Sequence, residues 1–186
     1  MHPSAPVSRR VSWVVVLALA LPSCSLPYIP GVTSPPPAAG VTLRDATGRV
    51  VGSAVFLQES DGVRLLLDLK GFAPGTKAVH IHDVGVCDPP SFESAGPHFN
   101  PTSAEHGSAN PKGPHAGDLP NITVDASGQG HLEVTNARVT LKPGPTTLLD
   151  TNGSALVVHE GPDDLHSNPA GNSGARVACG VLVRGG

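Results

Sequence analysis

The sequence predicts an all-β domain, an antiparallel Greek-key sandwich or flattened barrel that carries two long functional loops. Three observations predict it: short runs rich in β-branched residues recur along the chain, turn signals separate them, and no window shows a helical period with capping residues. Many short strands at regular spacing are typical of sandwiches and barrels.

The expected strands lie between turn signals that combine Asp or Asn with Gly. Asp and Asn side chains hydrogen-bond locally and Gly accepts a positive φ, and such turns occur at 45–48, 61–62, 125–128 and 150–153. The strands are expected over 50–58, 63–69, 78–84, 122–124, 131–139, 155–159 and 177–183. Because aromatic residues make up only 3% of the chain, the core must be built from Val, Leu, Ile and Ala.

Two segments do not follow the strand pattern. Residues 83–118 are rich in Gly, Pro, Ser, Asn and His without periodicity, and 161–175 form a second, shorter irregular stretch. Loops longer than about 12–15 residues are uncommon in compact domains unless they are functional or disordered. The first loop therefore needs something that holds it to the domain.

The N-terminal region reads as an export signal. Arg9 and Arg10 precede an apolar run, 11–21, which is too short to span a bilayer because a spanning helix needs about 20 residues. The ending L-P-S-C at Cys24 resembles a bacterial lipobox, which predicts lipidation of Cys24. Secretion with a different cleavage site and an uncleaved anchor are the alternatives.

These features divide the chain into three parts. We expect a lipoprotein-type signal peptide over 1–23, a Pro-rich extended linker over 24–40 and one domain over 41–186. The protein is expected to be exported to the periplasm or cell envelope, with membrane contact only through a lipid on Cys24. The formal net charge of −3 and the lack of a basic run argue against nucleic acid as a partner.

Three cysteines are present, and the export signal accounts for Cys24. Cys87 and Cys179 are left as a possible pair. In an exported protein a lone pair is read first as a disulfide, so we expect a structural bridge here.

Histidines supply the main functional signal. In K-A-V-H-I-H-D, His80 and His82 are two residues apart in an expected strand and therefore share a face. Two imidazoles there are costly in a core and ordinary on a surface, but they can also converge on a metal ion. His159 ends another apolar strand, whereas His2, His131 and His166 are assigned to solvent or ordinary hydrogen bonds.

The loop at 83–118 adds nitrogen and oxygen donors of the types that Zn²⁺ accepts: His98, His106, His115 and Asp118. Four such donors complete a closed tetrahedral shell. Metal binding would also supply the missing attachment for the loop, because it contributes directly to the free energy of folding.

Five motifs occur in an order that resembles the copper/zinc superoxide dismutase family over nearly all of 41–186: V-H-I-H, S-A-G-P-H-F-N-P, H-A-G-D-L, L-V-V-H-E and G-N-S-G-A-R-V-A-C-G-V. The resemblance implies an eight-stranded fold with one copper and one zinc per chain. It also implies an oxidoreductase that converts superoxide to dioxygen and hydrogen peroxide through alternating reduction and oxidation of copper. A homodimer is possible by the same resemblance.

The resemblance also implies a role for individual residues. Copper would be held by His80, His82, His98 and His159, and zinc by His98, His106, His115 and Asp118. His98 would then bridge the metals and exchange a proton during turnover. Asp163 would orient a copper and a zinc histidine, Cys87 and Cys179 would form the family disulfide, and Arg176 would attract superoxide beside the copper.

The chain departs from the family in the charge of its second loop, and two alternative functions stay open. Residues 161–175 contain no Lys or Arg, whereas many relatives carry charged guiding residues in that loop, and Lys112 is the candidate substitute. A non-catalytic copper-binding or delivery protein of the same fold is the main alternative function. A purely structural, zinc-stabilised domain is the other.

Overall fold

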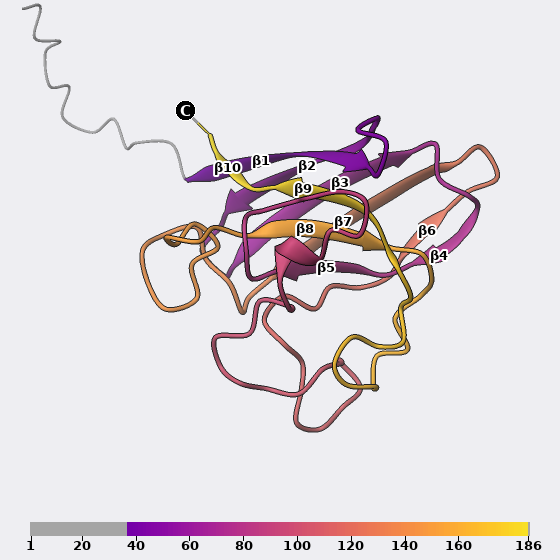
Figure 1. Ribbon diagram of the computed structural model, residues 1–186. Coiled ribbons are helices and arrows are strands. Elements are labelled where there is room, and N and C mark those ends of the chain that lie inside the picture. The colour runs from indigo at the N-terminus through magenta and orange to yellow at the C-terminus, as the bar shows by residue number, and fades with distance from the viewer. Residues whose placement is uncertain (1–36, 186) are drawn as a thin grey trace, which may run out of the picture. The chain divides into compact units, whose positions relative to one another are not determined.

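Antiparallel β-strands dominate residues 37–185, the part of the chain that the computed structural model describes (Figure 1). These residues contain one short helix, the 3-10 turn η1 (Glu93–Ala95). The strands are β1 (Ala38–Asp45), β2 (Val50–Gln58), β3 (Val63–Lys70), β4 (Gly75–Lys77), β5 (Val79–His82), β6 (Ile122–Val124), β7 (Gln129–Asn136), β8 (Ala155–His159), β9 (Arg176–Val181) and β10 (Val183–Arg184). The all-β prediction is confirmed.

The strands form one sheet that nearly closes into a barrel. Neighbours follow the order β4-β6-β7-β3-β2-β1-β9-β8-β5, and β10 pairs with β1. The two ends of this path, β4 and β5, are separated in the sequence only by Ala78, so the chain itself joins them. One residue separates β4 from β5, and one residue separates β9 from β10. When each of these pairs is counted as one strand, the described part of the chain has eight strands.

Aliphatic side chains fill the barrel, as the composition predicts. On β3, Val63, Leu65, Leu67 and Leu69 are buried and alternate with more exposed residues, which is the period of a strand with one face in the core. Phe56 on β2 adds an aromatic ring to the same cluster.

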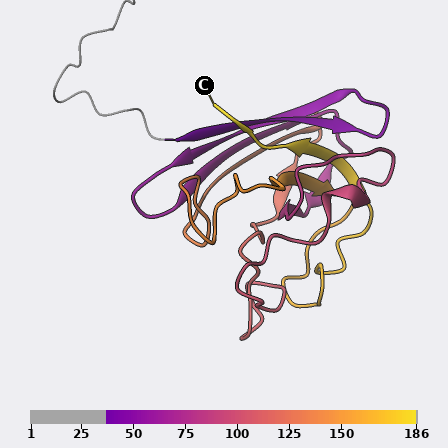
Figure 2. The ribbon, with the colours of Figure 1, turned by 60° about the vertical axis from the view of Figure 1, so that its left-hand side comes forward.

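Strands β5 and β8 differ because both of their faces are buried. Val79 and Ile81 face the barrel core, while His80 and His82 lie on the opposite face of β5. The loops 83–118 and 161–175 extend from the same side of the barrel and lie next to each other (Figures 1 and 2). Backbone hydrogen bonds join them, including one from Ala109 N to Leu165 O at 3.1 Å.

The predicted disulfide between Cys87 and Cys179 is present, with the Cα atoms 5.7 Å apart. The bridge connects the first long loop to β9. Next to it, Phe92 and Ala95 of the loop pack against Ala155 and Val157 of β8 in a second, smaller hydrophobic cluster. The outer face of β8 is therefore covered partly by the loop that follows β5.

The structure corrects several expected boundaries. β7 lies over Gln129–Asn136 rather than 131–139, β5 ends at His82 rather than at 84, and the last expected strand is divided into β9 and β10 at Leu182. Strands β1 and β4 were not predicted. Ala39, Val41 and Leu43 of β1 do alternate inward, but the neighbouring Pro and Gly residues hide this pattern in the sequence.

The first strand begins at Ala38, inside the range predicted as linker. The signal peptide predicted over 1–23, Cys24 and nearly all of the linker lie outside the described residues. Within residues 37–185 no helix has the length and apolar character needed to cross a membrane.

Candidate metal centre

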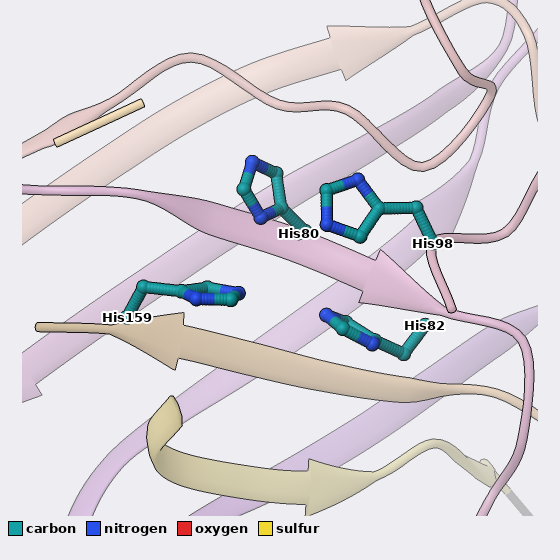
Figure 3. A group of neighbouring side chains, drawn as sticks. All are labelled: His80, His82, His98 and His159. Carbon is teal, nitrogen blue, oxygen red and sulfur yellow. The ribbon is translucent and has the colours of Figure 1, made fainter. Parts of the chain in front are cut away.

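The centre is built on the outer face of β5 and β8, beneath the long loops. β5 presents His80 and His82 on one face, as their spacing predicts, and both are buried. His159 ends β8 at a register shift between Val158 and His159. Such irregularities redirect a side chain, and here His159 turns toward β5 (Figure 3).

The first long loop returns to the edge of β5 and brings His98 with it. Phe99 N donates to Ile81 O at 2.8 Å, and an isolated bridge pairs His82 with His98. The rings of His80 and His98 are 4.0 Å apart between centroids. Three separate segments therefore converge on one buried position.

Four ring nitrogens in this group have no hydrogen-bond partner. They are Nδ1 of His80 and Nε2 of His82, His98 and His159, and they make up four of the five unpartnered buried side-chain atoms in the described residues. One ring nitrogen from each of the four histidines lies within 4.8 Å of the others, and the rings face one another in Figure 3. Unpartnered polar atoms are costly in a protein interior, and a shared metal ion removes that cost.

The opposite nitrogen of each of these rings is fixed by the protein. His80 Nε2 lies 2.9 Å from Asp163 Oδ2, and His82 Nδ1 lies 2.8 Å from Gly96 O. His159 Nδ1 lies 3.2 Å from Gly174 O and 3.1 Å from Ser173 Oγ. These contacts set the ring orientation and leave the inner nitrogens for a ligand, which is the usual arrangement around metal-binding histidines.

Burial keeps three of these histidines neutral. It lowers the pKa of His80 to about 3, of His82 to about 2 and of His159 to about 4. An imidazole binds a metal only in its deprotonated, neutral form. His80, His82 and His159 are therefore in their metal-binding form at neutral pH.

A second group of donors surrounds Asp118 Oδ1. The Nδ1 atoms of His98, His106 and His115 lie 2.9, 3.1 and 3.3 Å from this oxygen, and the Nδ1 atoms of His98 and His115 are 3.4 Å apart. Adjacent donors in a tetrahedral zinc shell are separated by about 3.3 Å, since each bond is about 2.0–2.1 Å long. Four of the six distances among the predicted zinc donors are thus close to this spacing.

His98 contributes one nitrogen to each group, Nε2 to the first and Nδ1 to the second. His80 also lies close to His98, His106 and Asp118. Its Nε2, however, is bound to Asp163, so it is a poorer zinc donor than His115.

Asp163 links the two groups, as its predicted role requires. Its Oδ2 contacts His80 Nε2 and its Oδ1 contacts His106 Nε2 at 3.0 Å. Burial alone would raise the pKa of Asp163, but hydrogen bonds with these two rings lower it to about 2. For His106 the effects have opposite signs: burial lowers its pKa, but the carboxylates of Asp118 and Asp163 raise it to about 9. Zinc binding at His106 would therefore release a proton.

Two residues that support Asp163 were missed in the sequence. The side-chain amide of Asn121 donates to Asp163 O at 2.9 Å and its oxygen accepts from Asp163 N at 2.8 Å. Gly171, at φ +63°, lies so close that a Cβ there would collide with the Asp163 carboxylate. Neither residue type is rare in loops, so the sequence offers no signal for them.

A pocket of about 820 Å³ opens onto the first group and reaches His82, His98 and His159. Arg176, the first residue of β9, is the one Lys or Arg among the residues that line it. Its guanidinium donates to Phe92 O and Gly96 O, each at 2.8 Å, so it is held in place beside the histidines. A small anion that enters here meets a fixed positive charge.

The remaining candidates lie elsewhere. Lys112 does not line this pocket, and its ammonium pairs with Glu105 at 3.1 Å, so the expectation that it replaces the missing guiding charges finds no support. His131 is exposed and pairs with Asp68 at 2.8 Å. His166 is exposed as well, as expected for a solvated loop residue.

Comparisons with known proteins show the family to which the chain belongs. The family model for copper/zinc superoxide dismutase (SODC) matches residues 50–182. The chain is 48% identical over 146 residues to superoxide dismutase [Cu-Zn] 2 of Aquifex aeolicus, covering 77% of this chain and 85% of that one. It is 42% identical over 147 residues to superoxide dismutase [Cu-Zn] of Caulobacter vibrioides, covering 77% and 84%.

Among solved structures, a SOD-like protein from Bacillus subtilis matches with a TM-score of 0.75 and 40% identity, covering 77% of this chain and 97% of that one. Copper and zinc are therefore the cofactors, and superoxide is the substrate. The chain belongs to the copper/zinc superoxide dismutase family of oxidoreductases.

Proposed function

We propose that this chain performs superoxide dismutation at the two groups of donors described above. Copper would bind to His80, His82, His98 and His159, and zinc to His98, His106, His115 and Asp118. The four unpartnered buried nitrogens are the observation that carries this assignment.

Copper supplies the one-electron oxidation and reduction that superoxide needs, while redox-inert zinc supplies a fixed positive charge. The protein would supply the anion site and one of the two protons that hydrogen peroxide needs, and water would supply the second. His98 lines the pocket, so a proton held on its Nε2 whenever that nitrogen is not bound to copper would lie beside the position where the substrate enters. Nδ1 of the same ring, directed at the Asp118 group, fixes the ring while that proton is held and released.

Arg176 would bind and orient the superoxide anion. A fixed guanidinium in a partly enclosed pocket attracts small anions more strongly than the same charge in open water. Because the other charged residues that line the pocket, Asp83 and Glu93, are acidic, Arg176 carries the attraction contributed by side chains.

Replacing Arg176 with Gln is expected to lower kcat/KM for superoxide by roughly tenfold or more at low salt. The kcat/KM of the variant should also fall less with rising ionic strength than that of native protein. Copper and zinc content should stay at the native level. Arg176→Lys keeps the charge and should retain more of the rate than Arg176→Gln. A neutral variant with full metal content and the native rate would contradict this role.

The activity itself is tested with purified, metal-loaded protein and a superoxide source. The decay of superoxide should be far faster than in controls that contain the same concentration of free copper. A copper-delivery protein of the same fold is the competing function, and retention of Arg176 beside the histidines supports catalysis instead. Tight retention of copper against a chelator would also count against delivery.

We propose in addition that the protein is exported and anchored through a lipid on Cys24. The disulfide supports an oxidising compartment such as the periplasm or cell envelope. A mature protein that begins at Cys24 and carries added acyl mass is the expected result of mass spectrometry on material from a bacterial host. A mature chain without that mass would refute the anchor. A homodimer stays a prediction from the family resemblance, which sedimentation analysis can test.

A further inference from the structure

The turn from His115 to Asp118 carries two of the proposed zinc donors and is held mainly through its backbone. Gly117 N donates to Phe99 O at 2.8 Å and Gly117 O accepts from Ile81 N at 2.9 Å. A Cβ at Gly117 would collide with Ile81 O, so the turn passes against the edge of β5 where no larger residue fits. This side of the turn is fixed by the barrel.

The other side of the turn is held by two side chains from the end of β7 and the residues after it. Asn136 Nδ2 donates to Ala116 O at 2.8 Å, and Arg138 Nη2 donates to Asp118 O at 2.9 Å. Asn136 is buried, and its own Oδ1 accepts from Arg138 N at 3.0 Å, which fixes the backbone from which Arg138 extends. The two donors thus bind alternate carbonyl groups of the zinc turn.

Other contacts hold the Asp118 carboxylate itself: its Oδ2 accepts from Gly107 N and from His115 N, each at 2.9 Å. A pocket of about 400 Å³ lies against Asp118, Asn136 and Arg138, so the turn is not covered there by tightly packed apolar side chains. Arg138 is exposed over much of its surface, and its partial burial lowers its pKa while the charge of Asp118 acts in the opposite direction. Its positive charge is therefore close to the carboxylate whose Oδ1 meets all three zinc histidines.

We propose that Asn136 and Arg138 are positioning residues of the zinc site, an inference that rests on the proposed zinc ligands. They hold the turn from His115 to Asp118 in its ligating geometry before the metal arrives. Without them the turn moves toward the adjacent pocket, Asp118 Oδ1 leaves the point where the three imidazoles meet, and zinc binds more weakly. Groups that orient metal ligands in this way typically change metal affinity about 10- to 100-fold.

The test measures zinc affinity rather than activity. Zinc is titrated into the metal-free protein in competition with a chromophoric chelator, for native protein, Arg138→Leu and Asn136→Leu. Both variants should bind zinc about 10- to 100-fold more weakly, and Arg138→Lys, which keeps a donor and a charge, should recover part of the loss. Cobalt(II) added in place of zinc should show a shifted visible absorption band in the leucine variants, which reports altered ligand geometry.

Arg64→Leu is the matched control. Arg64 lies on β3 and pairs with Glu59 and Glu133 on the outer face of the barrel, so its loss should leave zinc affinity unchanged. If a leucine variant fails to fold, as judged by its disulfide and circular dichroism, Arg138→Ala decides the question, because it removes the donor to Asp118 O without adding a bulky apolar side chain: native zinc affinity and cobalt spectrum in this variant would overturn the proposal. Leucine variants that fold and bind zinc within twofold of native would overturn it as well.

The proposed ligands have a separate test. His115→Ala should weaken zinc binding more strongly than either leucine variant, because it removes a donor. If His115→Ala leaves zinc affinity unchanged, the proposed zinc site is wrong. If His115→Ala weakens it and the leucine variants do not, the ligands are right and the positioning role is wrong.

Discussion

Replacing His98 with Ala is expected to lower superoxide dismutase activity by on the order of 10²–10⁴-fold, the range that loss of a positioned proton donor typically causes. His98 has a further role, because its two nitrogens face both donor groups. The same change should therefore alter the visible spectrum of bound copper and weaken zinc binding.

His131→Ala is the matched control for this variant. His131 is an exposed histidine on β7 whose ring contacts Asp68, so its removal tests the loss of an imidazole without disturbing the centre. Its activity and metal content should equal those of native protein. Near-native activity of His98→Ala at full copper and zinc content would show that the reaction does not pass through this residue.

Removing zinc is expected to open the loop 83–118 before the barrel unfolds. All four proposed zinc donors lie between His98 and Asp118, so zinc closes this part of the loop on itself. Lys112 is exposed between two of the donors and is the one Lys or Arg in 83–118, which makes it a single internal site for trypsin. Zinc binds the closed loop but not the open one. At a free zinc concentration 100 times its Kd, the metal should therefore slow cleavage about 100-fold.

The measurement is the rate of trypsin cleavage after Lys112 with and without zinc, while copper stays bound. Lys112→Gln serves as the control, because it removes the cleavage site and should leave the zinc-free loop intact in the same assay. Equal cleavage rates in the two metal states would mean that contacts other than zinc hold the loop.

Residue chemistry explains which parts of the site could be predicted. His80 and His82 interrupt an apolar strand, and His159 ends another, so each is a polar group where the strand pattern requires burial. Such residues need partners, and the loop between them supplies the remaining donors. The seven proposed ligand side chains are brought together in the structure for this reason.

Other features have no such signal. Asn121, Asn136 and Arg138 act on backbone atoms of loop segments that are distant in the sequence, and their residue types are common on protein surfaces. Strand β1 was missed because its inward residues include Ala39 and its outward residues include Gly40, both of which weaken the contrast that marks a strand. Contacts between segments decide these features, and a single sequence does not contain them.

Anomalous diffraction from crystals of the metal-loaded protein, recorded at the copper and zinc absorption edges, tests the central claim most directly. The expected result is one copper peak among His80, His82, His98 and His159 and one zinc peak among His98, His106, His115 and Asp118, with the His98 ring between them. Peaks elsewhere, the same metal at both positions, or a His98 ring bound to one ion alone would contradict the account.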